Sequence, residues 1–274
     1  MTRLEKKLAD LKAAGRKGLF IYITAGTPTI DESLRAMITA EKAGADVVEV
    51  GIPFSDPLAD GAVIQASSVT ALKNGITLEK ILDMCKKIRA ESDMPLIGMG
   101  YINNFMSYGY SGGSAAYDGF EKFIVDAKAA GMDGVIIPDV PHEESANMRA
   151  VCKKYEVHLT EFITPETTPE RMKETCASAS GFVYCVSNTG TTGVKKIDYS
   201  RINAKILDAR KFTDVAMAVG FGIGSGGVAV QAAQNSDAVI VGSAVVKLLH
   251  AGKFDDAMNL IKEIRTALDK SFNK

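Results

Sequence analysis

The segment Gly44-Ala45-Asp46-Val47-Val48, residues 44–48, decides the fold because it joins a helix-like stretch to an apolar, β-branched run. A similar sequence recurs at Gly131-Met132-Asp133-Gly134-Val135 and at Ser236-Asp237-Ala238-Val239-Ile240. Each copy has an aspartate at the turn from helix to strand. Repeated units of this kind are typical of α/β proteins with a parallel sheet.

Short apolar runs alternate with longer segments of helical period, as expected for parallel strands covered by helices on both faces. Eight strand-helix units fit a closed barrel better than an open sheet. We therefore predict a single (β/α)8 TIM barrel over residues 1–274, with an extra N-terminal helix in the basic, amphipathic segment Met1 to Gly18. The predicted strands are Leu19 to Thr24, Val47 to Val50, Leu96 to Met99, Val135 to Ile137, His158 to Ile163, Phe182 to Val186, Ala216 to Val219 and Ala238 to Val241.

Helix-like segments separate these runs, and some of them carry start signals such as Pro169 after Thr168, or Asp31 before an apolar-periodic stretch. No long linker divides the chain, and the segment from Gly109 to Gly119 is interpreted as an irregular surface excursion. The predicted helices include Asp31 to Ala43, Val63 to Leu72, Phe120 to Ala130, Glu143 to Tyr155, Pro169 to Ala177, Gly226 to Gln234 and Phe254 to about Asp269.

Composition indicates an ordinary globular protein, with 46% hydrophobic and 24% charged residues. Lys and Arg total 32 against 33 Asp and Glu, so we expect no nucleic-acid partner. The apolar run Leu19 to Thr24 is too short for a signal peptide or a membrane span, which predicts a cytoplasmic protein without membrane association.

Cysteine and histidine spacing predicts no metal site. The four cysteines (Cys85, Cys152, Cys176 and Cys185) are scattered and are expected to be reduced. Cys185 lies in an apolar run, where a small buried hydrophobic residue is the expected role. His158 is expected to point into a helix-strand layer and away from substrate.

Glu49 interrupts the apolar run Val47-Val48-Glu49-Val50 in a strand that should be buried on both faces. A buried carboxylate costs several kcal/mol unless it is paired or protonated. Chemistry that needs a carboxyl of raised pKa tolerates that cost. The alternative is a structural glutamate in an ion pair with a neighbour.

The loop after this strand carries two further carboxylates, Asp56 and Asp60. Aspartates in such loops commonly form turns or cap the next helix, and this structural role is favoured for Asp56, between Ser55 and Pro57. Asp60 precedes Gly61 and a helix-like stretch, so a helix-cap role and a catalytic role are both open.

Phosphate binding is predicted at two glycine-rich strand ends. These are residues 220–227, Gly-Phe-Gly-Ile-Gly-Ser-Gly-Gly, and Gly242-Ser243-Ala244. Backbone N–H groups and helix N-termini suit an anion, and barrels often bind phosphate with the loops after strands seven and eight. The small, polar segment Ser187 to Gly193 after strand six is interpreted as an active-site lid, or else as a plain surface loop.

The stretch Val48-Glu49-Val50-Gly51-Ile52-Pro53-Phe54-Ser55-Asp56-Pro57-Leu58-Ala59-Asp60-Gly61 resembles the signature of the tryptophan synthase alpha subunit family. Similar motifs occur along nearly the whole chain. They are Thr24-Ala25-Gly26, Gly134-Val135-Ile136-Ile137-Pro138-Asp139-Val140-Pro141, Thr167-Thr168-Pro169, Gly220-Phe221-Gly222-Ile223 and Val241-Gly242-Ser243-Ala244.

The resemblance implies cofactor-free, retro-aldol cleavage of indole-3-glycerol phosphate to indole and glyceraldehyde 3-phosphate. It also implies an alpha2-beta2 complex with a beta subunit, which carries pyridoxal phosphate. Glu49 matches the general acid-base residue, and Asp60 matches the carboxylate that stabilises charge at the indole N–H. By the same resemblance, Thr192 belongs to the closing loop, Gly193, Gly222 and Ser243 bind phosphate, and Tyr101, Tyr184 and Phe221 line the indole pocket.

The sequence departs from the family pattern at Ala62, Ile102 and Asn104, within segments through which the family meets its beta subunit. Other phosphate-binding barrels are the nearest rivals, but no metal-ligand set is found and Phe182 to Val186 contains no Schiff-base lysine. A stand-alone lyase that releases indole, and a catalytically weak subunit that mainly activates a beta partner, are the remaining alternatives.

Overall fold

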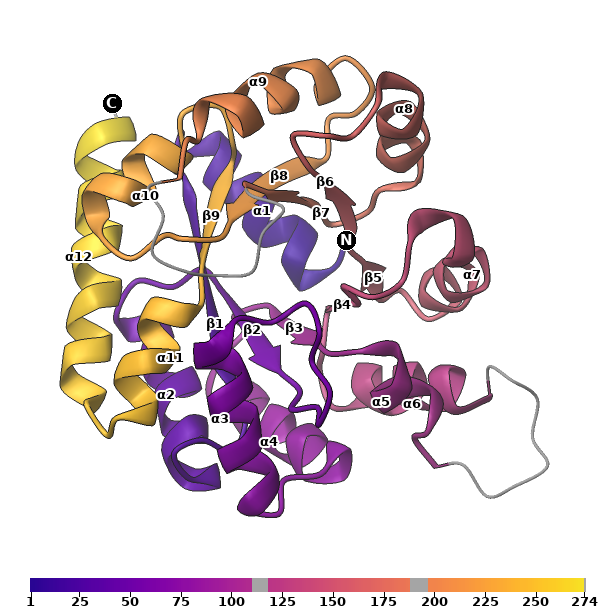
Figure 1. The fold of residues 1–274 in the computed structure, drawn as a ribbon, viewed down its shortest axis with the longest axis vertical. Coiled ribbons are helices and arrows are strands. Elements are labelled where there is room, and N and C mark those ends of the chain that lie inside the picture. The colour runs from indigo at the N-terminus through magenta and orange to yellow at the C-terminus, as the bar shows by residue number, and fades with distance from the viewer. Residues whose placement is uncertain (110–117, 188–196, 274) are drawn as a thin grey trace.

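The computed structural model describes residues 1–109, 118–187 and 197–273, and its described strands form one parallel sheet (Figure 1). The strand order is β5-β4-β3-β2-β1-β9-β8-β7-β6. The strands are β1 (Gly18–Thr24), β2 (Val47–Gly51), β3 (Leu96–Met99), β4 (Gly134–Ile136), β5 (His158–Leu159), β6 (Glu161–Ile163), β7 (Phe182–Val186), β8 (Ala216–Gly220) and β9 (Ala238–Val241).

The sheet closes at Thr160, because β5 and β6 are the two parts of one short segment. β5 pairs with β4, whereas β6 pairs with β7. The predicted strand from His158 to Ile163 is therefore wrong as a continuous element. The segment changes partner at Thr160, whose N–H still donates to the Val135 carbonyl at 3.0 Å. The predicted closed barrel is confirmed.

Helices surround the barrel and join successive strands (Figure 1). None of the helices in the described part of the chain is long and apolar enough to span a membrane. The helices are α1 (Arg3–Ala13), α2 (Ile30–Lys42), α3 (Ala62–Lys73), α4 (Leu78–Glu91), α5 (Ile102–Met106), α6 (Asp118–Ala129), η1 (His142–Glu144), α7 (Ala146–Lys154), α8 (Pro169–Ser178), α9 (Ser200–Ala209), α10 (Gly226–Ala232), α11 (Ser243–His250) and α12 (Phe254–Phe272).

Some predicted helix ends need correction. The segment from Glu143 to Tyr155 is two elements, η1 and α7, which meet at Ser145, whose hydroxyl donates to the His142 carbonyl at 2.8 Å. α2 is capped by Thr29, which accepts a hydrogen bond from the Glu32 N–H, so Asp31 lies inside the helix. α10 ends at Ala232, before the predicted Gln234.

The barrel interior is apolar at its N-terminal end. Phe20, Val47, Ile97, Ile136 and Phe182 pack there as one buried cluster. The predicted N-terminal helix, α1, closes this end by inserting the fully buried Leu4. His158 faces the same closed end, since its Nε2 lies 2.9 Å from the Thr2 hydroxyl, and burial lowers its pKa.

The repeated aspartates hold neighbouring strands together. Asp46, Asp133 and Asp237 each accept a hydrogen bond from the backbone N–H of Leu19, Leu96 or Met217 on the preceding strand in the barrel, at 2.9, 3.0 and 2.7 Å. The backbone N–H of each aspartate donates to the carbonyl of the same strand residue at 2.8 Å. The sequence repeat is therefore a repeated strand-pairing device.

Asp133→Ala should lower the free energy of unfolding by about 3 kcal/mol. The Asp133 side chain is only 4% exposed, and its loss leaves the Leu96 N–H without this acceptor and removes one ion pair each from Arg3 and Arg89. Chemical denaturation measures the change. Asp93→Ala is the matched control, because Asp93 is 96% exposed and contacts the same Arg3. Equal stability of the two variants would contradict this role for Asp133.

Candidate active site

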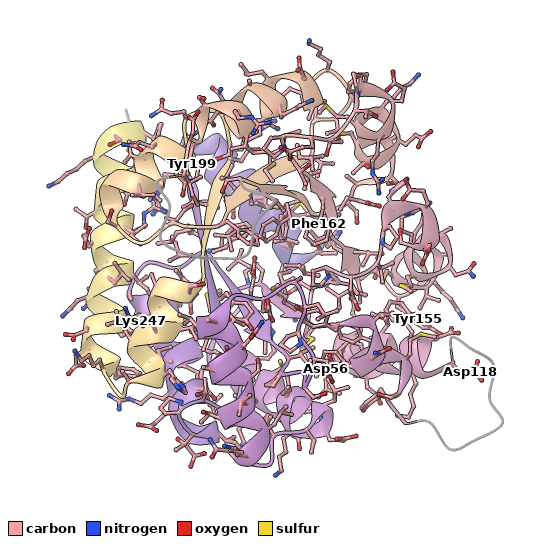
Figure 2. All side chains as sticks on the ribbon, viewed as in Figure 1. Asp56, Asp118, Tyr155, Phe162, Tyr199 and Lys247 are labelled. Atoms are coloured by element: carbon pink, nitrogen blue, oxygen red, sulfur yellow. The ribbon has the colours of Figure 1, made fainter. Side chains whose placement is uncertain are left out.

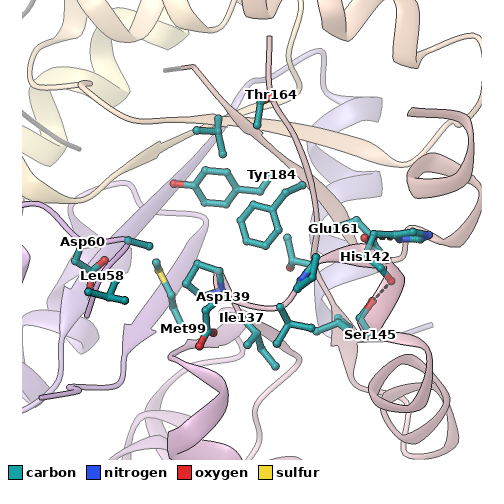
Figure 3. Close-up of a pocket in the computed structure, with 18 of the residues that line it drawn as sticks. Leu58, Asp60, Met99, Ile137, Asp139, His142, Ser145, Glu161, Thr164 and Tyr184 are labelled. Atoms are coloured by element: carbon teal, nitrogen blue, oxygen red, sulfur yellow. Dashed lines mark hydrogen bonds and ion pairs between the residues drawn. The ribbon is translucent and has the colours of Figure 1, made fainter. Parts of the chain in front are cut away.

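A cavity of about 530 Å³ lies at the carboxyl ends of the strands, where barrel enzymes place their active sites (Figure 3). It extends from Asp60, after β2, to His142 and Ser145, after β4 (Figure 3). Apolar and aromatic side chains form much of its wall: Leu58, Met99, Ile137, Leu159, Phe162, Tyr184, Val186 and Phe221.

Glu49 is 1% exposed on β2, a strand whose five residues are all buried. Its partners in the sheet register are Tyr22 on β1 and Ile97 on β3. Among the described residues, its Oε1 atom has no hydrogen-bond partner, and no cation pairs with it. The alternative of a structural ion pair therefore finds no support in this part of the chain.

Burial alone raises the pKa of Glu49 to about 8. The ionised form loses its hydration and gains no counter-charge, so the neutral form is favoured at neutral pH. A carboxyl group with this pKa can both donate and accept a proton near pH 7.

Asp60 lies in the loop between β2 and α3. The helix-cap alternative is wrong, because Gly61 is the N-cap of α3 and no side chain caps that end. Burial raises the pKa of Asp60 to about 6, and a hydrogen bond from Tyr101 partly opposes the shift. Asp60 is therefore mostly ionised at pH 7, whereas Glu49 is mostly protonated.

Tyr101 holds the loop that carries Asp60. Its hydroxyl oxygen accepts a hydrogen bond from the Ala59 N–H at 3.0 Å, and its ring stacks on Phe54 with 5.3 Å between centroids. Asp56, in the same loop, is exposed and accepts a hydrogen bond from Ser55 at 2.5 Å. The structural role predicted for Asp56 agrees with this local turn.

Two tyrosines lie near the carboxyl groups, and each uses space that a neighbouring glycine leaves open. A Cβ atom at Gly51 would clash with the Tyr22 hydroxyl, and one at Gly220 would clash with the Tyr184 hydroxyl. Burial raises the pKa of both tyrosines, and the charges of Asp60 and Glu49 raise it further. Both phenols therefore stay neutral.

Sequence reasoning identified Tyr184 and missed Tyr22. The available signal was a tyrosine near the carboxyl end of the otherwise apolar run Leu19 to Ile23, in the strand beside Glu49. It also missed the polar end of the cavity, where His142 Nδ1 lies 3.0 Å from the Glu161 carboxylate and Arg149 binds the same group at 3.2 Å. No group of residues suited to a metal ion is found in residues 1–109, 118–187 or 197–273.

Aromatic rings form one wall of the cavity. Phe162 and Tyr184 pack with 5.5 Å between ring centroids, and Phe162 lies near the centre of the barrel (Figure 2). Phe221 follows β8 with φ of 78°, a left-handed conformation that is uncommon for a residue other than glycine and is concentrated at functional sites. The cavity therefore offers flat apolar surfaces to a ring-shaped ligand.

The predicted phosphate loops lie after β8 and β9. Ser187 and Tyr199 donate to the carbonyls of Gly220 and Phe221 at 2.8 and 2.9 Å, which fixes the turn before Gly222. Ser243 is the first residue of α11, so its N–H belongs to the unpaired amides of a helix N-terminus. The lid residues Thr192 and Gly193 lie outside the described residues.

Fold and site together define a (β/α)8-barrel enzyme with two carboxyl groups of different pKa, one sealed in a strand and one in the wall of an aromatic cavity. Comparisons with known proteins identify the family. The sequence model of the tryptophan synthase alpha chain family matches residues 8–272. The chain belongs to that family.

Individual relatives are similar to this chain over nearly its whole length. The tryptophan synthase alpha chain of Clostridium kluyveri is 38% identical over 274 residues, covering 98% of this chain and 100% of the relative. That of Caldanaerobacter subterraneus is 39% identical, covering 97% and 96%. The solved alpha subunit from Legionella pneumophila has a TM-score of 0.87 at 34% identity, covering 98% and 99%. A tryptophan synthase structure from M. tuberculosis has a TM-score of 0.86 at 28% identity, covering 98% and 100%.

Glu49→Gln should become more stable than the wild type as pH rises. The folded-state pKa of Glu49 is raised from 4.5 to about 8, so its contribution to stability is present below pH 4.5 and is lost as pH rises towards 8. The free energies of unfolding of Glu49→Gln and the wild type should be equal near pH 4.5 and should differ by a few kcal/mol, in order of magnitude, above pH 8. Urea denaturation at several pH values measures this difference.

Asp60→Asn is the matched control, since the pH range over which Asp60 affects stability lies lower, between pH 3.8 and about 6. Parallel stability profiles for Glu49→Gln and the wild type would show that Glu49 is not sealed from water.

Proposed function

We propose that this chain catalyses the retro-aldol cleavage of indole-3-glycerol phosphate to indole and glyceraldehyde 3-phosphate, as the alpha subunit of tryptophan synthase in tryptophan biosynthesis. Membership of the family supports this activity. The observation that carries it is the buried, unpaired Glu49, which is protonated at neutral pH, together with an ionised Asp60 that lines the aromatic-walled cavity.

Glu49 is the acid-base residue of the proposed reaction. Its carboxyl proton passes to the indole C3, which creates an indoleninium cation and a carboxylate. The carboxylate then takes the proton of the hydroxyl on the carbon attached to C3. As that C–O bond becomes a carbonyl, the electrons of the C–C bond return to the ring, and Glu49 is protonated again. One residue thus returns to its starting state in each turnover.

Asp60 supplies the charge that balances the cation. Protonation at C3 places positive charge on the indole nitrogen, and a carboxylate near that N–H lowers the energy of the intermediate. Two carboxyl groups with separated pKa values can divide the acid and electrostatic roles. The raised pKa of Glu49, about 8, and the lower value of Asp60, about 6, fit that division.

The substrate is bound at both of its ends in this proposal. Gly222 and Ser243, with Gly193 in the lid loop, bind the phosphate through backbone N–H groups. Tyr101, Tyr184 and Phe221 contact the indole ring, and Thr192 belongs to the loop that closes over the substrate.

A beta subunit is the proposed partner, in an alpha2-beta2 assembly that receives the indole. The alpha reaction as written balances without a cofactor, and pyridoxal phosphate is expected only in the beta subunit. The proposed location is the cytoplasm.

Glu49→Gln should lower kcat for indole release by about 10²- to 10⁴-fold, because the amide cannot donate and recover the proton. Purified chain is assayed with indole-3-glycerol phosphate, with and without a beta subunit. Asp56→Asn, an exposed carboxyl of the same loop, is the control for the chain alone and should turn over normally. Normal turnover by Glu49→Gln would refute the acid-base role, and no cleavage by the wild type in either assay would refute the proposed function.

Asp60→Asn should lower kcat by about 10²-fold and should also change the pH profile. The profile of kcat/KM should rise through about pH 6 as Asp60 ionises, and fall above about pH 8 as Glu49 loses its proton. The variant should lose the acidic limb and keep the alkaline one. An acidic limb that persists in Asp60→Asn would assign that limb to another group.

A further inference from the structure

Tyr22 spans the gap between the proposed phosphate site and Glu49. β1 lies between β9 and β2 in the sheet, so its carboxyl end separates Gly242 from Glu49. A Cβ atom built on Gly242 would lie 3.5 Å from the Tyr22 Cβ atom, whereas one built on Gly51 would clash with the Tyr22 hydroxyl. The tyrosine side chain therefore runs from the end of β9 to the end of β2.

The three-carbon chain of the proposed substrate crosses the same gap. Its phosphate end is assigned to the loops after β8 and β9, and its carbon next to the indole is assigned to Glu49 on β2. The side chain that faces the barrel interior between these two points on β1 is Tyr22, which is 7% exposed and opposite Glu49 in the strand register. The hydroxyl groups of the chain therefore pass beside a phenol.

The Tyr22 hydroxyl is available to donate a hydrogen bond. Its nearest hydrogen-bond partner among the described residues is the Thr24 hydroxyl, at 3.5 Å. Thr24 is closer to Ser67, at 2.8 Å, and Ser67 donates to the Ile64 carbonyl at 2.7 Å. The Tyr22–Thr24 contact is therefore long and weak, and the phenol stays neutral because burial raises its pKa.

We infer that Tyr22 is a substrate-binding residue, whose hydroxyl donates a hydrogen bond to a hydroxyl oxygen of the three-carbon chain of indole-3-glycerol phosphate. This inference rests on the proposed function. It adds a third polar group to the site, between the phosphate loops and the carboxyl pair, and it makes the enzyme selective for a hydroxylated chain. An analogue that lacks the hydroxyls gains nothing from Tyr22.

The test combines one change in the protein with one change in the ligand. Tyr22→Phe should lower kcat/KM for cleavage of indole-3-glycerol phosphate by about three- to tenfold, the range expected for one neutral hydrogen bond. The inhibition constant of indole-3-propanol phosphate, which has the same ring and phosphate but no chain hydroxyls, should not change. Tyr155→Phe removes a hydroxyl at the periphery, where it donates to Glu121 (Figure 2), and should change neither value.

Two results would overturn the inference. An unchanged kcat/KM in Tyr22→Phe would show that the hydroxyl is not used. An equal loss for substrate and analogue would assign Tyr22 a packing role. Absence of cleavage by the wild type would overturn the proposed function as well, so the two failures are distinguishable.

Discussion

The desolvation of one carboxyl group, that of Glu49, is the constraint on which the site depends. An unpaired carboxylate in an apolar barrel costs several kcal/mol, so the group is neutral unless a cation or water reaches it. Its neighbours exclude both, because Tyr22 and Ile97 flank it in the sheet and leave only 1% of its surface exposed. The sealed surroundings keep a proton on Glu49 at neutral pH.

Acidic residues have different surroundings at the two ends of the barrel. At the N-terminal ends of the strands, Asp46 and Asp133 are buried and fully used, each bound to a strand N–H and to arginine. Towards the carboxyl ends, Glu49 is buried and Asp60 is half-buried, and each has few partners. Stability and chemistry are therefore separated along the strand axis, as is usual in barrels. A carboxyl group without partners is tolerated because the paired ones hold the strands.

The architecture could be predicted from the sequence because apolar runs and helix-to-strand turns mark each unit. The break at Thr160 could not, since β5 and β6 differ in their pairing partners and not in their local composition. Asp60 illustrates the same limit. An aspartate before a glycine and a helix suits a cap, and only the observed N-cap at Gly61 separates the two interpretations.

The position of Tyr22 in the site depends on contacts between strands, which the local sequence does not reveal. Its place beside Glu49 follows from the register of β1 and β2, and the room for its hydroxyl follows from Gly51 on β2. None of these relations is local in sequence. Residues such as Glu49 are conspicuous because they break a pattern, whereas a tyrosine in an apolar strand fits the pattern and escapes notice.

The most direct test of this account is the protonation state of Glu49 itself. Infrared difference spectra between the wild type and Glu49→Gln, recorded across pH, isolate the carboxyl stretch of this one residue. A protonated carboxyl band should persist at pH 7 and disappear with a midpoint near pH 8. A carboxylate already formed at pH 6 would contradict it, because Glu49 would then have water or a counter-charge at hand.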